Sequence, residues 1–262
     1  MKPIPFVHAA VTALVFAGCS TVPETGRHQL MLMSQSEENA QGVAAYGEYK
    51  TQNKISTNVR YTEALNRCGA ALKSVAGRDD FDWEFTLFDS KTENAFCLPG
   101  GKVAFYSGIV DKMDNEAEMA FVMAHEVAHA IARHGGEKVS WNKLCSLGGA
   151  LVAIGFKNDT INEIYGIGSQ VGVTLPFSRR DESEADFIGL KLMARAGYDP
   201  EAAPAFWKRF AAGHAQTSAI DNILSTHPCD ADRIKAMEEN LAAAKEEYAK
   251  ATTKRGYGEK FR

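Results

Sequence analysis

The chain has 262 residues, of which 45% are hydrophobic and 24% are charged, and its net charge is −4. This length supports one large domain with a substantial core. The charge shows no basic excess, which argues against a nucleic acid as partner. No internal apolar run reaches the length of about 18 residues that a membrane-spanning helix needs. The nearest one, residues 144–156, is short and rich in glycine, so we expect a buried helix or a flap over a cleft.

The N-terminus has the pattern of a secretory signal peptide: a basic residue, the apolar residues 4–17, and small residues before Cys19. This ending resembles a bacterial lipobox in which Cys19 carries the lipid, although a plain signal peptide with an incidental cysteine is the alternative. We expect residues 1–18 to be the signal peptide and residues 19–34 to be a lipidated tether. An acyl chain would attach the protein to a membrane without spanning it. Ser20 resembles the sorting pattern of the bacterial outer membrane, so we expect a location there, facing the periplasm.

The remainder is expected to form one domain, residues 35–251, followed by a polar, mobile tail at residues 252–262. Helical patterns cover residues 36–50 and 58–75. Apolar and polar side chains then alternate from residue 83 to residue 88, which predicts a strand. Most of the elements expected in the domain are helices.

A hairpin is expected next, because the apolar runs 94–98 and 102–106 flank the turn sequence Pro99-Gly100-Gly101. The predicted fold class is therefore α+β, mostly helical with a small sheet. A strand of this hairpin could pair with an extended peptide backbone. The alternative is a hairpin with a structural role alone.

The most informative stretch runs from Asn115 to Gly136 and contains H-E-x-x-H at residues 125–129. Asn115 and Glu118 have the spacing of a capping box, and Gly135-Gly136 is expected to end the helix. His125 and His129, four residues apart, lie on one face of such a helix. Two imidazoles in this arrangement can bind one Zn²⁺, with Glu126 beside the metal as general base.

A catalytic zinc needs a third protein ligand. The H-E-x-x-H-x-x-G-x-x-H pattern fails, because the chain has Ala132 and Gly135 at the required glycine and histidine positions. His134 is therefore expected to be an ordinary histidine at a helix end. Glu182 and Asp186, four apart at a helix start, would let Glu182 bind the metal while Asp186 accepts a hydrogen bond from a ligand histidine. The alternative is a charged, solvated helix start.

The two motifs together, HEVAHAIARHG at 125–135 and SRRDESEADFIG at 178–189, resemble the metallopeptidases that include the CAAX prenyl protease, HtpX and the mitochondrial overlapping-activity protease. The similarity extends to NAFCLPGGKV at 94–103 and STHP at 225–228, and covers about residues 30–240. Because no membrane-spanning segment is expected, the chain is most similar to the lipoprotein proteases of the bacterial outer membrane within this group.

The resemblance implies a role for each residue that matches a motif. His125, His129 and Glu182 would bind a single zinc ion, with Glu126 as the catalytic base. Asp186 would support a ligand histidine. His227 would stabilise the oxyanion of the tetrahedral intermediate, with Arg233 as an orienting group. The implied substrate-binding residues are Asn94, Ala95 and Phe96.

The implied function is a zinc-dependent endopeptidase that cleaves misfolded or misassembled cell-envelope proteins. Its partners would be protein substrates, a membrane through the lipid anchor, and other envelope proteases or assembly factors. Two alternatives remain open: a metal-binding chaperone or assembly factor that does not cleave, and a zinc amidase acting on the cell wall.

Four cysteines follow Cys19, at positions 68, 97, 145 and 229. An even number in an oxidising compartment suggests disulfides, but four cysteines allow three pairings. Cys97 and Cys229 lie beside proposed active-site segments in the sequence, so a bridge between them is one possibility.

Overall fold

The computed structural model describes residues 19–149, 178–214, 223–256 and 260–261. The predicted signal peptide and the second half of the segment 144–156 lie outside these residues. The described elements are, in order, β1 (Cys19–Thr21), β2 (His28–Leu30), α2 (Gln35–Gln52), α3 (Val59–Lys73), β3 (Glu84–Phe88), β4 (Ala95–Leu98), β5 (Lys102–Tyr106), α4 (Ser107–Val110), α5 (Glu116–Ile131), α6 (His134–Gly149), α8 (Arg179–Arg195), α9 (Ala202–His214), a 3₁₀ turn (Ile223–Ser225) and α10 (Ala231–Lys250). This mostly helical α+β architecture confirms the predicted fold class.

The small sheet has the strand order β3–β5–β4. Strands β4 and β5 form the predicted antiparallel hairpin, closed where Leu98 pairs with Lys102. Gly100 and Gly101 turn the chain with φ angles of 82° and 76°, a region that favours glycine. β3 runs parallel to β5. This order leaves one side of β4 without a neighbouring strand among the described residues.

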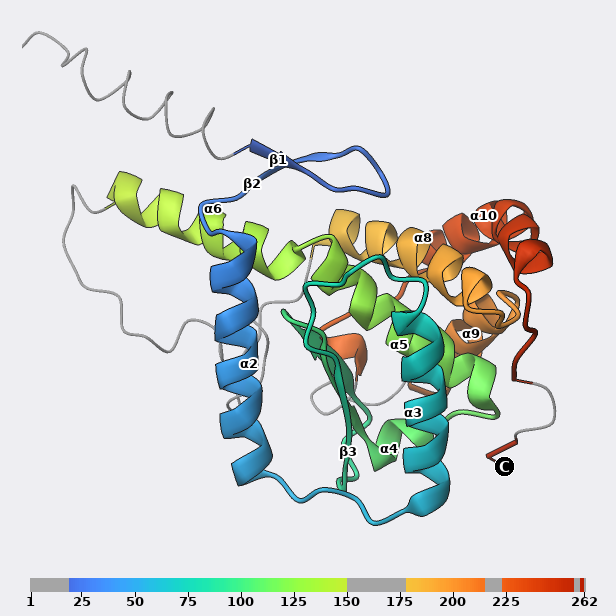
Figure 1. Cartoon of the computed structure of the whole chain (residues 1–262). Coiled ribbons are helices and arrows are strands. Elements are labelled where there is room, and N and C mark those ends of the chain that lie inside the picture. Colours follow the sequence, from blue (N-terminus) through green and yellow to red (C-terminus); the bar gives the residue numbers. More distant parts are fainter. Residues whose placement is uncertain (1–18, 150–177, 215–222, 257–259, 262) are drawn as a thin grey trace, which may run out of the picture.

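Helices cover both faces of the sheet (Figure 1). On one face, Tyr46 and Tyr49 of α2 pack against Phe88, Leu98 and Ala104. On the other face, α3 and α5 share a larger core with the remaining inward side chains of the strands, including Leu87, Ala95, Cys97, Val103 and Phe105. Because apolar side chains alternate between the faces of a strand, both layers bury apolar surface.

Helix α5 lies at the centre of the molecule, and all its residues are buried. Asn115 accepts a hydrogen bond from the Glu118 backbone N–H at 3.1 Å, as a cap does. The Glu118 carboxylate binds the backbone N–H of Asp114 at 2.8 Å, one residue before the position that a capping box requires. Helices α8 and α10 stack beyond α5 (Figure 1), so the three helices place their facing side chains in one interior.

The C-terminus of α5 differs from the prediction. The helix ends at Ile131, Arg133 adopts φ 58°, and α6 already begins at His134, so Gly135-Gly136 lies inside α6. The Arg133 side chain explains the break: its guanidinium donates to the Glu38 carboxylate at 2.6 Å and to the Met33 carbonyl at 2.8 Å. Contacts from the N-terminal part of the chain thus hold the left-handed residue.

The segments expected as tether and tail are packed where the structure describes them. Residues 19–30 form a two-stranded ladder, and Val22 is fully buried between α5 and α8. At the other end, Phe261 is 8% exposed and its backbone N–H binds the Asp114 carbonyl at 2.9 Å. Val22 and Phe261 thus anchor the N-terminal and C-terminal segments through buried apolar contacts.

Among the described residues, no helix has the length and apolar character to cross a membrane. Cys68, Cys97 and Cys229 are free thiols. The suggested bridge between Cys97 and Cys229 is therefore not formed, and each side chain packs individually in or against the main core.

Candidate metal centre

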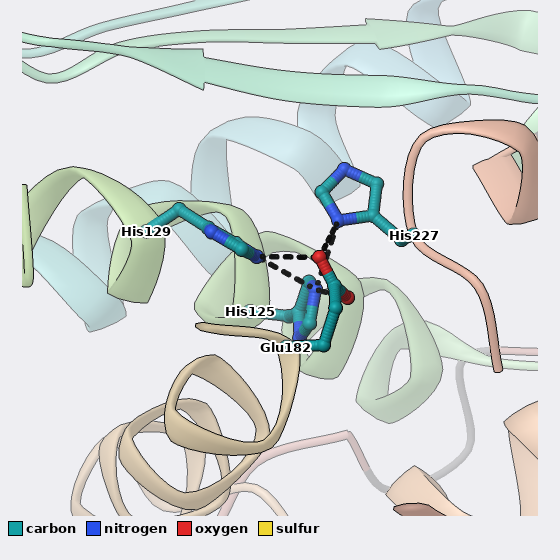
Figure 2. A group of neighbouring side chains, drawn as sticks. All are labelled: His125, His129, Glu182 and His227. Atoms are coloured by element: carbon teal, nitrogen blue, oxygen red, sulfur yellow. Dashed lines mark hydrogen bonds and ion pairs between the residues drawn. The ribbon is translucent and has the colours of Figure 1, made fainter. Parts of the chain in front are cut away.

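Four buried side chains from three separate segments converge beside the middle of α5 (Figure 2). His125 and His129 come from α5, Glu182 from the first turn of α8, and His227 from the loop after the 3₁₀ turn. One ligand atom from each lies within 4.8 Å of the others, so the four can hold a metal ion. The structure thus brings the three predicted zinc ligands together with His227.

The spacing of the donor atoms suits zinc. At bond lengths of about 2.0–2.1 Å, two ligands of a tetrahedral zinc ion lie about 3.3–3.4 Å apart. The His125 and His129 Nε2 atoms are 3.2 Å apart. The Glu182 oxygens lie 3.4 Å from His125 Nε2 and 3.5 Å from His129 Nε2. Two imidazoles and one carboxylate are also the ligand set of known catalytic zinc sites.

Burial and neighbouring charges favour the ligand protonation states that a metal needs. Burial lowers the pKa of His129 well below its usual value, so its ring is neutral. Burial raises the pKa of Glu182, but the electrostatic and hydrogen-bonding interactions with the surrounding imidazoles, His227 foremost, outweigh it and hold that pKa well below the ordinary value. An ionised carboxylate and a neutral imidazole are the forms that bind zinc.

His125 is oriented by a carboxylate on its far side. Its Nδ1 lies 2.9 Å from Asp186 Oδ1. Arg233, 3% exposed in the first turn of α10, donates to both Asp186 oxygens at 2.7 and 2.9 Å. Burial lowers the pKa of His125, but hydrogen bonds to Asp186 and Glu182 raise it to about 10, so a bound metal would displace a proton from this ring. Arg233 also lies 2.9 Å from Glu182.

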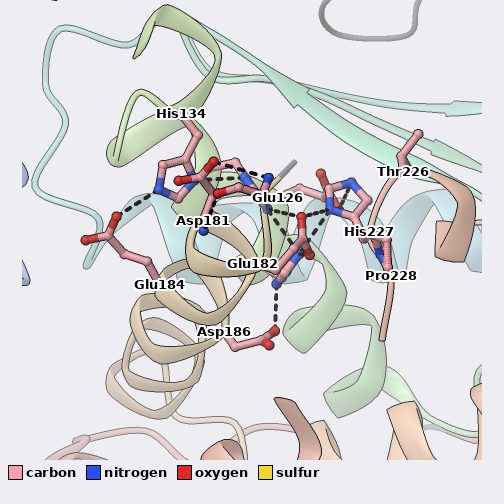
Figure 3. Close-up of polar contacts among 12 residues, drawn as sticks. Glu126, His134, Asp181, Glu182, Glu184, Asp186, Thr226, His227 and Pro228 are labelled. Carbon is pink, nitrogen blue, oxygen red and sulfur yellow. Dashed lines mark hydrogen bonds and ion pairs between the residues drawn. The ribbon is translucent and has the colours of Figure 1, made fainter. Parts of the chain in front are cut away.

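His129 is supported by residues that the sequence analysis missed. His134, expected to be an ordinary helix-end histidine, is 1% exposed, and its Nδ1 lies 2.9 Å from His129 Nδ1. Its Nε2 lies 2.9 Å from Glu184 of α8 (Figure 3). Burial raises the pKa of Glu184, but hydrogen bonds from His134, Thr25 and Arg27 lower it to about 2. His134 can contact His129 because α5 ends at Ile131 and α6 begins at His134. No local sequence pattern predicts this helix end.

Glu126 has the surroundings of a proton acceptor. It is 3% exposed, and its Oε1 has no hydrogen-bond partner among the described protein atoms. The Nε2 atom of His227 lies 3.5 Å from this oxygen. Burial raises the pKa of Glu126 above its ordinary value, which favours a carboxylate that takes up a proton during a reaction. A buried, unpartnered carboxylate oxygen beside a metal group needs a ligand such as water.

His227 lies among the donor atoms of the metal group. Its Nδ1 is 3.0 Å from Glu182 Oε1 and 3.3 Å from His125 Nε2, which places it among the donors (Figure 2). The backbone holds the loop, because the His227 N–H binds the Ile223 carbonyl at 2.8 Å and Arg233 binds the Pro228 carbonyl at 2.7 Å. With His227 in this position, the described side chains supply four donors.

The predicted substrate-binding residues lie at the start of β4. Ala95 is 1% exposed in the core on the α5 face. Phe96 contacts Tyr49 and Tyr106 on the opposite face, with ring centroids 5.3 and 6.3 Å away. The Asn94 side-chain oxygen accepts a hydrogen bond from the Ala95 backbone N–H at 2.8 Å, and its backbone carbonyl accepts from the Tyr106 N–H at 3.2 Å. Their side chains are therefore engaged within the fold, and the outer backbone edge of β4 is the part that a peptide could pair with.

Comparison with known proteins agrees with this site. Peptidase family M48 matches residues 60–241. The mitochondrial metalloendopeptidase OMA1 of Schizosaccharomyces pombe is 36% identical over 202 residues, which cover 77% of this chain and 58% of the relative. OMA1 of Saccharomyces cerevisiae is 37% identical over 264 residues, covering 90% and 75%. The β-barrel assembly-enhancing protease of Escherichia coli is 28% identical over 225 residues, covering 82% and 46%.

These relatives correct one expectation and confirm another. Fungal and plant relatives with 36–37% identity are named as mitochondrial enzymes, which overturns the expected location in a bacterial outer membrane. The resemblance read from the H-E-x-x-H motif and the Glu182 motif is confirmed, because the matched range contains both. The chain belongs to peptidase family M48.

Proposed function

We propose that the protein is a zinc-dependent endopeptidase. The observation that carries the proposal is the buried Glu126 carboxylate, with one oxygen unpartnered, beside a donor group that fits zinc. Family membership and the names of the metalloendopeptidase relatives support it. In this proposal His125, His129 and Glu182 hold the zinc ion.

A bound zinc ion would act as a Lewis acid and lower the pKa of water at the site. Glu126 would accept the proton of the attacking water at its unpartnered Oε1 and deliver it to the leaving amine. His227 would donate a hydrogen bond to the developing oxyanion, often the largest catalytic contribution. In the structure His227 Nδ1 lies 3.0 Å from Glu182 Oε1, among the donors. To donate to the oxyanion, the His227 ring would have to turn away from the Glu182 carboxylate.

The substrates proposed are misfolded or misassembled envelope proteins. The outer edge of β4 can bind a peptide only as an added extended strand, through main-chain hydrogen bonds. A compact folded protein does not offer such a segment, whereas an unfolded one does. The Escherichia coli relative is named for β-barrel assembly, which agrees with a substrate of this kind.

The activity is tested by incubating the full chain with casein, with and without a zinc chelator. We expect cleavage that the chelator abolishes and zinc restores. Glu126→Gln should keep one zinc per chain and the same melting temperature while its kcat falls at least about 10³-fold, since it loses the base. Full activity in Glu126→Gln, or no cleavage by a zinc-loaded parent, would contradict the proposal, and the second result would favour a role in binding without cleavage.

Substrate preference is tested with one protein in two states. Reduced, alkylated lysozyme should be cleaved, and the native disulfide-bonded protein should resist. Equal cleavage of both would argue against recognition by strand addition. Lipidation of Cys19 remains a prediction, and the mass of the mature N-terminal peptide from the native host tests it.

A further inference from the structure

The two ring nitrogens of His129 have different neighbours. Nε2 lies in the donor group, 3.2 Å from His125 Nε2, and Nδ1 lies 2.9 Å from His134 Nδ1. A metal binds an imidazole nitrogen through its lone pair, so the proton of a neutral His129 must be on Nδ1. His129 then donates to His134, and the His134 proton must be on Nε2. His134 Nε2 then donates this proton in a hydrogen bond to Glu184 Oε2, 2.9 Å away.

This chain of hydrogen bonds ends on the N-terminal part of the protein. Arg27 donates from Nε to Glu184 Oε2 at 2.7 Å, and the Thr25 hydroxyl donates to Glu184 Oε1. Arg27 also pairs with Glu137 of α6 at 2.8 Å. Metal binding at His129 Nε2 therefore fixes which atom donates and which accepts in each hydrogen bond of the path that connects His129, His134, Glu184 and Arg27.

The β1–β2 segment is itself fixed in place. Val22 is fully buried against Ala128, Ala132, Ala185 and Ile188 of α5 and α8. Glu24 pairs with Arg195 at the far end of α8 at 2.8 Å. A donor attached to a fixed segment can hold its acceptor at a defined place, which a freely moving tether could not do.

We propose that residues 19–30 are a working part of the metal centre: Thr25 and Arg27 orient the zinc ligand His129 through Glu184 and His134. The four are positioning residues, since none of them belongs to the donor group. The inference rests on the proposed zinc ligands. It assigns a role in metal binding to a segment that the sequence indicates as a tether.

Zinc affinity measured by competition with a chromogenic chelator tests the first half of the path. His134→Phe retains the ring but removes both nitrogens, and we expect zinc affinity to fall about 10–100-fold, as for other partners of metal-bound histidines. His134→Gln, which can still accept and donate, should recover part of the loss. The matched control is His214→Phe, because His214 also pairs with a glutamate, Glu93 at 2.6 Å, outside the donor group. It should leave zinc affinity unchanged.

The second half of the path is tested by Arg27→Ala with Glu24→Ala as control. Both changes remove an ion pair from the same segment, but only Arg27 contacts Glu184. Arg27→Ala should lower zinc affinity several-fold and Glu24→Ala should not. If Arg27 acts through His134, adding Arg27→Ala to His134→Phe should cause little further loss.

The visible spectrum of the Co²⁺-substituted protein gives a second readout, because a rotated ligand ring changes its bands while a structural loss elsewhere does not. Melting of the metal-free variants checks that they fold. Unchanged affinity and spectrum in His134→Phe, or additive losses in the double variant, would overturn the proposal. A parent protein that binds no zinc would instead refute the proposed function, so the two failures are distinguishable.

Discussion

His125 and His129 of α5 belong to one donor group but are supported by opposite ends of the chain. His125 is held by a carboxylate directly, Asp186, which is fixed by Arg233 of the C-terminal helix α10. His129 is held by a second imidazole, His134, whose carboxylate is fixed from the N-terminal segment. The two histidines of one helix thus have two different supporting arrangements.

The difference lies in burial. Asp186 and Arg233 are 3% exposed, so the first arrangement is an ion pair almost without solvent. The Arg27 side chain is 17% exposed, so the second arrangement reaches water at its outer end. Buried ion pairs are costly to break because the remaining charge is left without water or partner. We expect the first to matter more for folding and the second more for metal affinity alone.

The largest effect should be common to both histidines. In the proposed site His125→Ala and His129→Ala each remove one of three protein ligands. With metal-binding free energies of about 10–16 kcal/mol shared among the three, each loss should weaken zinc binding by more than about 100-fold. Elemental analysis after gel filtration should find no zinc in either variant. Zinc retained by one of them would show that only the other is a ligand.

Asp186→Ala should separate the two supporting arrangements. It leaves the Arg233 guanidinium buried without its main partner, and we expect a loss of about 3–5 kcal/mol in the free energy of unfolding of the metal-free protein. Glu184→Ala should cost about 1.5–3 kcal/mol, because it removes hydrogen bonds to a charged group that water can partly replace.

Urea unfolding measures both changes. Asp89→Ala is the control, because it breaks an exposed ion pair with Lys54, which should be worth about 0–1 kcal/mol. Equal costs for Asp186→Ala and Glu184→Ala would contradict the distinction based on burial.

Gly189→Ala tests whether α8 must lie close to α5. A Cβ at Gly189 would lie 3.0 Å from the His125 backbone nitrogen and 3.1 Å from the Ala124 carbonyl carbon, so the helices would have to separate. We expect a loss of about 1–3 kcal/mol in stability and weaker zinc binding, since α8 carries Glu182. Gly47→Ala in α2 meets no atom within 4 Å and should be neutral or stabilising by up to about 1 kcal/mol. Equal effects of the two substitutions would argue against close packing as the cause.

The C-terminal arrangement could be predicted from the sequence because its residues follow regular spacing. Glu182 and Asp186 lie one turn apart on one helix, so a metal ligand and its supporting carboxylate can be read from their separation. The hairpin at residues 94–106 could also be predicted from a local pattern, because typical turn residues lie between its two apolar runs.

The N-terminal arrangement could not be predicted, because it depends on where α5 ends. If the helix continued to Gly135, the five residues from His129 to His134 would turn it by about 500°, which is about 140° more than a full turn. The two side chains would then point to different sides of the helix. The actual break at Arg133 is held by Glu38 and the Met33 carbonyl, almost 100 residues away in the sequence. Local helix propensities cannot predict a contact between residues so far apart in the sequence. Val22 likewise gave no periodic signal, since a single apolar residue among polar ones fits a linker as well as a packed hairpin.

The smallest effect should come from Thr25→Val, which changes the shape of the side chain very little. It removes one hydrogen bond to Glu184 and leaves those from Arg27 and His134 in place. With two donors remaining, we expect a cost of about 0.5–1.5 kcal/mol in stability and a weakening of zinc binding below that of Arg27→Ala. Thr21→Val in the same segment is the control, because the Thr21 hydroxyl contacts the exposed His28 ring at 3.4 Å and takes no part in the path to His129. If Thr25→Val weakened zinc binding as strongly as His134→Phe, the ring of His134 would not be the route by which the segment reaches His129, and the two supporting arrangements would have to be linked through the backbone of α8.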